Sequence, residues 1–197
     1  MSLDYYGYAP LLRLQRPLAL CGLPGTERGS TARVVSMFSG VPVVRVEDQV
    51  AHLAGCHWDL LVLRDGAEAA LALETQVIDR ALSGRSAPVI GLSSITLQDA
   101  ELRARLLAHS TVVHLQLSLS DSLARVQAQS LADPRRHAAL RAGEPPTAGL
   151  LLPKLRFLER LCRAAHRAHP VGSAGAHEVG RALLETLEEA AGHQGRG

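Results

Sequence analysis

Residues 18–33 read Leu-Ala-Leu-Cys-Gly-Leu-Pro-Gly-Thr-Glu-Arg-Gly-Ser-Thr-Ala-Arg, and this stretch decides the fold. The apolar run 18–21 has the length and composition of a strand that is covered on both faces. Three glycines and a proline then break regular structure, and Ser30 or Thr31 is expected to cap the helix that follows. The stretch therefore predicts a buried strand, a glycine-rich turn and the start of a helix.

This arrangement suits an anion, because a helix N-terminus directs backbone N–H groups and the positive end of the helix dipole to one spot. The catalytic form of such a loop is G-x-x-x-x-G-K-[ST], in which lysine neutralises the outer phosphates and the hydroxyl holds magnesium. Counted from Gly22, the last three positions are Glu27, Arg28 and Gly29. Aligned on the Ser-Thr pair that follows, the loop is one residue too long and Gly29 stands at the lysine position. Neither register contains a lysine.

Two interpretations of the loop stay open. Partial glycine motifs are weak evidence, so the stretch is also compatible with an ordinary strand-to-helix turn that binds nothing. If it binds phosphate or a nucleotide, the expected residues are Gly22, Gly25, Arg28, Gly29, Ser30 and Thr31.

The composition fits one compact domain, with 197 residues of which 47% are hydrophobic. A net charge of +2 and 3% aromatic residues do not indicate a nucleic-acid surface. Lys154 is the single lysine, and the other basic residues are arginines. The three cysteines have no paired spacing, so neither a disulfide framework nor a metal site is expected. Because no apolar run approaches about 18 residues and no signal-peptide pattern is visible, we expect a cytoplasmic protein without membrane contact.

Strand-like and helix-like segments alternate along the chain. The expected strands are 18–21, 42–46, 88–91 and 111–117, with a further short candidate at 60–63. The first expected helix starts at residue 30 or 31. Further helices are expected at 48–54, 67–82, 97–108, 122–130, 150–169 and 177–191. This alternation predicts an α/β fold, with a parallel sheet that helices cover on both faces.

We expect one domain over residues 17–191, preceded by an extension at 1–16 and followed by a flexible tail at 192–197. The extension holds all three tyrosines and is a candidate interaction segment. Residues 133–146 are rich in proline and arginine and poor in large apolar side chains, which is typical of a mobile lid.

The order of these elements resembles that of the shikimate kinase family, small P-loop kinases that transfer the γ-phosphoryl group of ATP to the 3-hydroxyl of shikimate. The resemblance runs from about Pro17 to Leu187 and rests on the spacing of landmarks more than on motif identity. It implies the three-layer sandwich of P-loop NTPases more strongly than it implies the activity.

In the family, the second strand ends in Asp-x-Asp, whose first aspartate helps to organise magnesium and whose second binds shikimate and acts in proton transfer. The matching triplet is Arg45-Val46-Glu47. The resemblance therefore implies that Glu47 is the catalytic residue if the protein is active. Arg45 places a cation where the family has the aspartate that assists the metal.

Further family positions are altered or shifted. The first substrate-binding arginine becomes Leu71, whereas the second is matched by Arg163 and the lid arginine by Arg136, or by Arg135 in a shifted register. The family's glycine triplet, which brings backbone close to the substrate, corresponds to Ser93-Ser94-Ile95. The β-branched Ile95 does not easily take the positive φ that glycine permits.

These replacements lead to two functional hypotheses. The first is a shikimate-kinase-like pseudoenzyme, a binding, sensing or scaffolding module for a protein, a small molecule or a nucleotide such as ATP or ADP, with magnesium in doubt. In it, Arg28 and Arg45 are expected to form a metal-independent anion site, and Glu47 and Arg163 to hold the hydroxyl and carboxylate of a metabolite. The alternative for Arg28 is a surface pair with Glu27. The second hypothesis is an active ATP-dependent kinase for shikimate or a related hydroxy acid.

Overall fold

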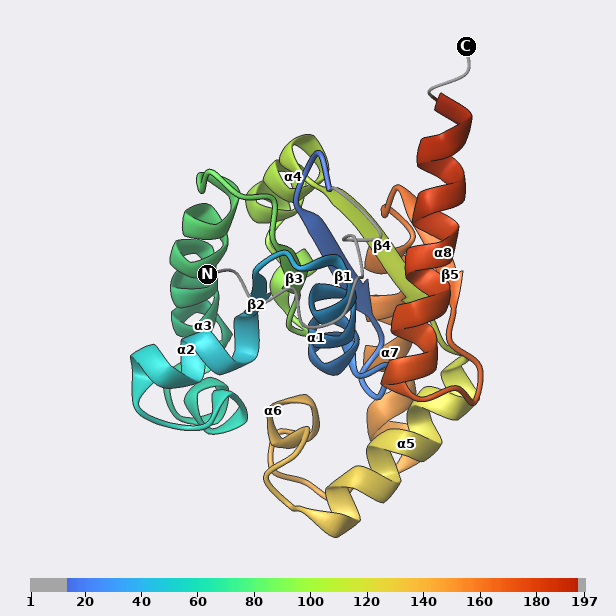
Figure 1. Cartoon of the computed structure of the whole chain (residues 1–197). Coiled ribbons are helices and arrows are strands. Elements are labelled where there is room, and N and C mark those ends of the chain that lie inside the picture. The colour runs from blue at the N-terminus through green and yellow to red at the C-terminus, as the bar shows by residue number, and fades with distance from the viewer. Residues whose placement is uncertain (1–13, 195–197) are drawn as a thin grey trace, which may run out of the picture.

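Five parallel strands form one sheet in the order β2-β3-β1-β4-β5 in the computed structural model, which describes residues 14–194 (Figure 1). The strands are β1 Leu18–Gly22, β2 Val43–Arg45, β3 Val89–Gly91, β4 Thr111–Gln116 and β5 Arg167–Pro170. Helices flank both faces of this sheet (Figure 1). The predicted α/β fold with a parallel sheet is therefore confirmed.

The helical elements occupy most of the remaining chain. They are α1 Arg28–Ser39, α2 Val46–Ala54, α3 Trp58–Leu82, the 3₁₀ turn η1 Thr96–Gln98, α4 Ala100–His109, α5 Leu119–Ala132, α6 Ala138–Arg141, α7 Ala148–Cys162 and α8 Ala176–Gln194. Every helix within residues 14–194 is too short or too polar to traverse a bilayer.

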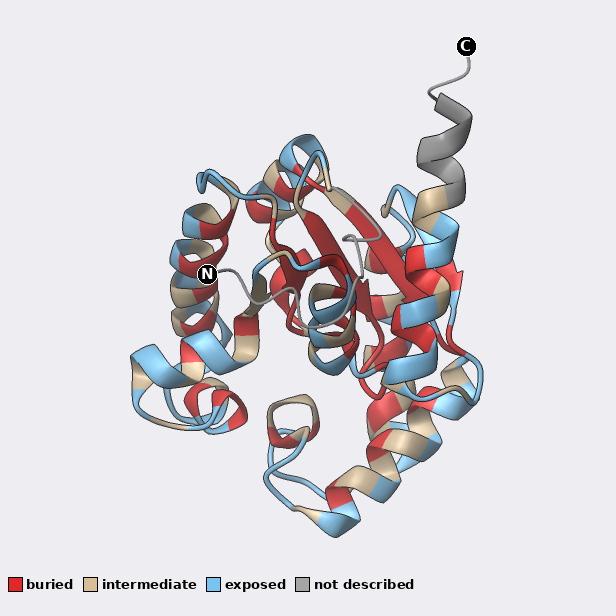
Figure 2. Cartoon of the chain, in the orientation of Figure 1, coloured by how far each residue is buried: buried red, intermediate tan, exposed pale blue. Residues whose placement is uncertain are grey.

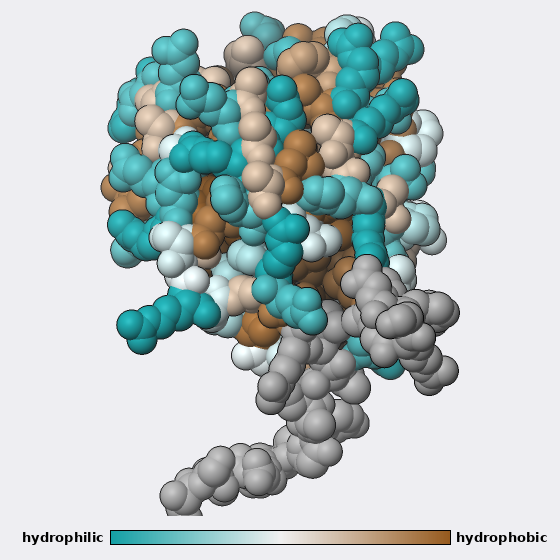
Figure 3. Space-filling model, turned by 90° about the horizontal axis from the view of Figure 1, so that it is seen from above, coloured by the Kyte–Doolittle hydropathy of each residue, from teal (hydrophilic) through white to brown (hydrophobic). Residues whose placement is uncertain are grey.

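The hydrophobic core consists of two main clusters, one on each face of the sheet. Alternate residues of a strand point to opposite faces and therefore belong to different clusters. In β1, Ala19 and Cys21 belong to the cluster with α2, α3, α4 and α7, whereas Leu18 and Leu20 belong to the cluster with α1 and α8. All residues of β1 and β3 are buried, which explains why they read as unbroken apolar runs (Figure 2). The face seen in Figure 3 carries mostly polar side chains with apolar ones between them.

The structure corrects two expected elements. Residues 60–63 form part of α3 and not a strand: the His57 side chain accepts a hydrogen bond from the backbone N–H of Asp59 and caps this helix. Short apolar runs do not distinguish strand from helix, and the exposed Leu60 and Leu63 beside the buried Leu61 follow helical spacing. The predicted helix 150–169 ends at Cys162, because 167–170 pairs with β4 as the edge strand β5. Backbone pairing here overrides a sequence without β-type residues.

The first helix begins earlier than expected. Glu27 is its N-cap, in the left-handed conformation with φ 53° and ψ 40°, and Arg28 is the first helical residue. The expected caps, Ser30 and Thr31, therefore lie inside α1. Gly29 is in close contact with β3, since a Cβ on Gly91 would lie 3.0 Å from the Gly29 Cα.

The proline-rich segment 133–146 contains the short helix α6, which contacts α3 and α7. The three tyrosines of the N-terminal extension lie outside the described residues.

Candidate functional site

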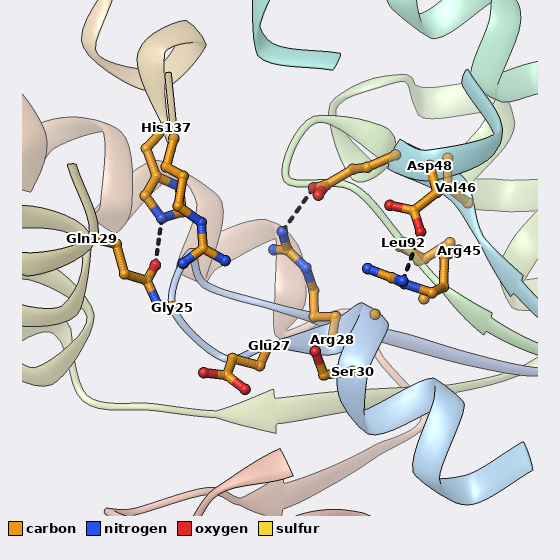
Figure 4. A pocket seen from close by; sticks show the side chains of 14 residues that line it. Gly25, Glu27, Arg28, Ser30, Arg45, Val46, Asp48, Leu92, Gln129 and His137 are labelled. Carbon is orange, nitrogen blue, oxygen red and sulfur yellow. Dashed lines mark hydrogen bonds and ion pairs between the residues drawn. The ribbon is translucent and has the colours of Figure 1, made fainter. Parts of the chain in front are cut away.

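A cavity of about 210 Å³ opens at the carboxyl ends of β1, β2 and β3 (Figure 4). Its lining comes from the loop after β1, the start of α2, the end of β3, and the α5–α6 region. The residues are Gly25, Glu27, Arg28, Gly29, Ser30, Arg45, Val46, Glu47, Asp48, Gly91, Leu92, Gln129, Arg136 and His137. In open parallel sheets this edge is where ligands bind, and the segments that resemble a kinase site converge here.

The loop after β1 packs closely against β4 and α5 at two of its glycines. Gly25 has φ +89°, a conformation that other residues rarely adopt, and a Cβ there would lie 2.9 Å from the Cβ of Arg125. Both the backbone conformation and the lack of space therefore require glycine at this position. A Cβ on Gly22 would lie 2.8 Å from the carbonyl oxygen of Leu115. Because α1 starts at Arg28, this arginine stands at the lysine position of the motif.

Arg28 is buried, and its guanidinium is held between two acceptors. Nη1 donates to the carbonyl oxygen of Gly22, and Nη2 donates to Glu47 Oε1 at 3.2 Å (Figure 4). The partner is thus the carboxylate at the start of α2, and not Glu27, whose side chain is exposed. The surface pair weighed for Arg28 and Glu27 is absent from the described ion pairs.

Arg45 lies directly against Gly29. A Cβ on Gly29 would lie 3.0 Å from Arg45 Nε and 3.7 Å from its Nη2. Arg45 Nη1 pairs with Asp48 Oδ2 at 2.7 Å, whereas its buried Nε has no hydrogen-bond partner among the described residues. The guanidinium therefore fills the space that a serine or threonine side chain at the Gly29 position would enter.

The residues present do not fit a magnesium site of the kind that the loop motif builds. The hydroxyl position is Gly29, and the strand-end position is the cation Arg45. Within residues 14–194, no three His, Cys, Asp or Glu side chains gather as metal ligands. Ser30 lines the cavity, whereas Thr31 is buried and its Oγ1 has no partner among the described atoms.

The opposite wall comes from α5 and from the segment before α6. His137 Nε2 lies 2.7 Å from Gln129 Oε1 (Figure 4). Burial lowers the pKa of His137 to about 4, and the charges of Arg28, Arg136 and Arg141 act in the same direction. The ring is therefore neutral at pH 7. Of the two lid candidates, Arg136 lines the cavity, whereas Arg135 pairs with Asp133 at 3.3 Å.

The structure separates the other expected site residues from this cavity. Leu71 packs against the core, and the Ser93 hydroxyl lies 3.0 Å from Thr96 Oγ1. Ser94 and Ile95 line a second cavity of about 430 Å³, between the start of α3, α6 and α7.

Arg163 does not meet Glu47. It follows the end of α7 and lines a separate pocket beside His114. Its exposed side chain lies 3.5 Å from Glu159. The structure therefore does not bring together the pair expected to hold a metabolite.

Several site residues were not found from the sequence. Asp48, Gln129 and His137 line the cavity, yet each is a single polar residue outside any motif. Asp48 follows the Arg45-Val46-Glu47 triplet at the spacing i, i+3 from Arg45, which is the one signal that predicts its ion pair.

Comparisons with known proteins agree with this architecture. No protein-family model matches the chain. The shikimate kinase of Thermobifida fusca (strain YX) is 31% identical over 112 residues, which cover 56% of this chain and 64% of that relative. The chain thus matches less than two thirds of the length of this curated relative.

Among solved structures, shikimate kinase from Acinetobacter baumannii in complex with shikimate matches with a TM-score of 0.73 and 20% identity, over 89% of this chain and 95% of that one. Shikimate kinase from Aquifex aeolicus gives a TM-score of 0.71 at 14% identity, over 89% and 98%. A gluconokinase from Sinorhizobium meliloti gives 0.54 at 18% identity, over 93% and 99%. The chain therefore resembles a shikimate kinase over part of its sequence, and it shares the fold of the shikimate kinase structures.

Proposed function

Because the chain is shikimate-kinase-like in sequence and fold, we propose that it is a non-catalytic module that binds a phosphorylated ligand without magnesium. ATP and ADP are the first candidates. The main support for the proposal is the contact between the Arg45 guanidinium and Gly29. A Cβ on Gly29 would lie only 3.0 Å from Arg45 Nε. The Arg45 guanidinium, a cation that is part of the chain, then occupies the region where the catalytic loop holds a magnesium ion through its hydroxyl.

Guanidinium groups are suited to this role. Arginine is always charged, and its planar fork of N–H donors matches the oxygens of a phosphate. Arg45 has a buried Nε without a partner, and Arg136 presents a second guanidinium from the opposite wall. The backbone N–H groups at the start of α1 complete an anion site.

The same replacements oppose catalysis. Phosphoryl transfer depends on positioned cations and magnesium around the moving charge, and loss of one such donor typically costs about 10²- to 10³-fold in rate. Glu47, which matches the position of the family's proton-transfer aspartate, is paired with Arg28 at 3.2 Å. Glu27 adds a negative charge beside the loop. These losses need not multiply, but together they favour binding over turnover.

Calorimetric titration with ADP, ATP and inorganic phosphate tests the proposal, in EDTA and in excess magnesium. We expect similar affinity for ADP in both conditions, and about tenfold weaker binding for Arg45→Met, since a charged hydrogen bond is lost. Arg33→Met is the matched control, because Arg33 is exposed on α1, the helix that follows the loop, and does not line the cavity. Binding that requires magnesium, or no binding in either condition, contradicts the proposal.

The alternative is an active kinase for shikimate or a related hydroxy acid. It is supported by Arg28 at the lysine position and by a carboxylate, Glu47, at the edge of the same cavity. Release of ADP from ATP in the presence of shikimate and similar hydroxy acids distinguishes the two functions. Turnover that disappears in Glu47→Ala overturns the non-catalytic proposal. Docking to another protein stays part of the first proposal, and a pull-down with the full chain tests it.

A further inference from the structure

The thiols of Cys21 and Cys162 meet inside the core, although the two residues lie far apart in the sequence. Cys21 lies near the end of β1, Cys162 is the last residue of α7, and this helix packs against that strand. Cys21 is 2% exposed and Cys162 is 4% exposed, and both belong to the same hydrophobic cluster. A hydrogen bond joins the two side chains. The fold therefore creates a thiol pair that no spacing in the sequence predicts.

This hydrogen bond makes the two thiols chemically different. The S–H group of Cys21 donates to the sulfur of Cys162, which raises the pKa of Cys21 well above its usual value and lowers the pKa of Cys162. Burial opposes ionisation of both thiols, whereas the positive charge of Arg28 favours it in both. Because the thiolate is the reactive form of cysteine, Cys162 is the better nucleophile of the pair.

Cys162 is also the thiol that a small molecule can reach. It lines a pocket of about 220 Å³ between the end of α7, β4 and β5, together with polar side chains that include Gln116, Arg163 and His166. Cys21 does not line this pocket. An oxidant of about the size of water would therefore meet Cys162 first, and Cys21 would lie behind it.

His114 adds an unpaired polar group to the same pocket. It pairs with Cys21 in the parallel ladder of β1 and β4, so the two side chains project from the same face of the sheet. His114 is 6% exposed, and its buried Nε2 has no hydrogen-bond partner among the described residues. Burial lowers the pKa of this ring. A buried polar atom without a partner is costly, and a polar oxidant in the pocket supplies one.

We propose that Cys21 and Cys162 form a peroxide-sensitive pair that closes a reversible disulfide between β1 and α7. The Cys162 thiolate attacks one oxygen of a hydroperoxide, the O–O bond breaks, and Cys162 becomes a sulfenic acid. The other oxygen leaves and takes a proton from solvent. The Cys21 sulfur then attacks the Cys162 sulfur, the S–O bond breaks, and the hydroxyl leaves as water with the proton of the Cys21 thiol. The two sulfurs together lose two electrons, which the peroxide gains.

Two other roles of the pair fit these observations less well. Buried cysteines commonly act as small apolar side chains, but such a role requires neither a partner thiol nor contact with a pocket. A metal site is not built here, since no three His, Cys, Asp or Glu side chains gather as ligands within residues 14–194. The redox role does not depend on phosphate binding, because neither cysteine lines the first cavity.

The first test counts thiols in the full chain after treatment with hydrogen peroxide, without nucleotide. We expect two of the three thiols to be lost and to return after reduction with dithiothreitol. Peptide mapping without reductant should find one link, between the peptides that contain Cys21 and Cys162. Cys56→Ala is the matched control, because Cys56 is the remaining free cysteine, and this variant should form the same link.

Single variants test the order of the two steps. Cys21→Ala should leave a sulfenic acid on Cys162 that dimedone labels, because the second thiol is missing. Cys162→Ala should keep Cys21 as a free thiol under the same treatment. Circular dichroism identifies loss of folding in either variant, and the mapping of the unmodified chain tests the proposal without any substitution.

Three results on the unmodified chain would overturn the proposal. They are survival of all three thiols, a disulfide that includes Cys56, and a sulfinic acid on Cys162 without a disulfide. None of these measurements requires a nucleotide, so failure of the phosphate site and failure of the thiol pair are separable.

Discussion

Arg28 Nη2 lies 3.2 Å from Glu47 Oε1, so the arginine at the lysine position of the loop is already paired with a carboxylate before any ligand arrives. A second pair, Arg45 with Asp48 at 2.7 Å, repeats this arrangement at the neighbouring wall. Both guanidinium groups are thereby oriented, and both must share their donors with a bound phosphate.

Glu47→Gln should strengthen the binding of ADP, because Arg28 is released from its carboxylate. The Glu47 side chain is 43% exposed, and such pairs contribute about 0.2–1 kcal/mol, so we expect a gain of about 1.5- to fivefold. Calorimetry in EDTA measures it, with Glu101→Gln on the exposed surface of α4 as the control. Weaker binding in Glu47→Gln would show that this carboxylate supports the ligand.

Glu27→Gly should raise both stability and phosphate affinity. Glu27 has φ 53°, a conformation in which glycine avoids the steric cost of a side chain. The left-handed conformation costs a non-glycine residue about 1–2 kcal/mol, and the backbone entropy that glycine loses offsets part of this. We therefore expect a net gain of about 0.5–1 kcal/mol in the free energy of unfolding, measured by urea denaturation, together with tighter binding of ADP. Glu27→Gln separates the two effects, since it removes the charge but keeps the strain. If it stabilises the chain as much as glycine does, backbone strain is not the cause.

Gly29→Ser should weaken ADP binding in EDTA, because its Cβ would lie 3.0 Å from Arg45 Nε and displace that guanidinium. The double variant Gly29→Ser/Arg45→Asp restores a hydroxyl and a carboxylate, and its ADP binding should become dependent on magnesium. Gly149→Ser is the control, since no atom lies within 4 Å of a Cβ there. A double variant that still ignores magnesium would contradict the assignment of these two positions.

Protonation of His137 should lower the stability of the protein as the pH falls from about 6.5 to about 4. The pKa of this ring is lowered from 6.5 to about 4 in the folded chain, so the unfolded chain binds the proton first. The contribution is fully present above pH 6.5 and is lost on approaching pH 4, and it amounts to roughly 3 kcal/mol, since each pKa unit corresponds to about 1.4 kcal/mol. Urea midpoints at pH 7 and pH 5 measure the loss. His137→Asn should reduce it, whereas His109→Asn, on the exposed end of α4, should not.

The sequence predicted the parts of the fold that depend on local pattern. The apolar run 18–21 and the glycines after it predicted β1 and the loop, and Glu47 and Arg45 were matched from the spacing of the second strand. The structure supplied the start of α1 at Arg28, because a non-glycine residue in the left-handed conformation at Glu27 has no sequence signal.

Residues on distant elements were harder to assign. Lys154 lies on α7 and Arg163 directly follows it, and their places along the helix decide which of two separate pockets each of them lines. The side chains of Gln129 and His137 meet through the path of the segment before α6, which local pattern does not determine. The edge strand β5 forms through backbone hydrogen bonds to β4. The side-chain pattern of residues 167–170 gives no signal for this pairing.

The two arginine–carboxylate pairs of the first cavity also bear on ligand selectivity. Each arginine is neutralised by its carboxylate partner, Arg28 by Glu47 and Arg45 by Asp48. The two pairs therefore produce only a weak electrostatic potential to attract small anions from solution. Chloride or sulfate would have to compete with a tethered carboxylate for each guanidinium. A ligand that engages the loop backbone and both arginines at once overcomes this competition, so the cavity discriminates by the number of simultaneous contacts and not by charge alone.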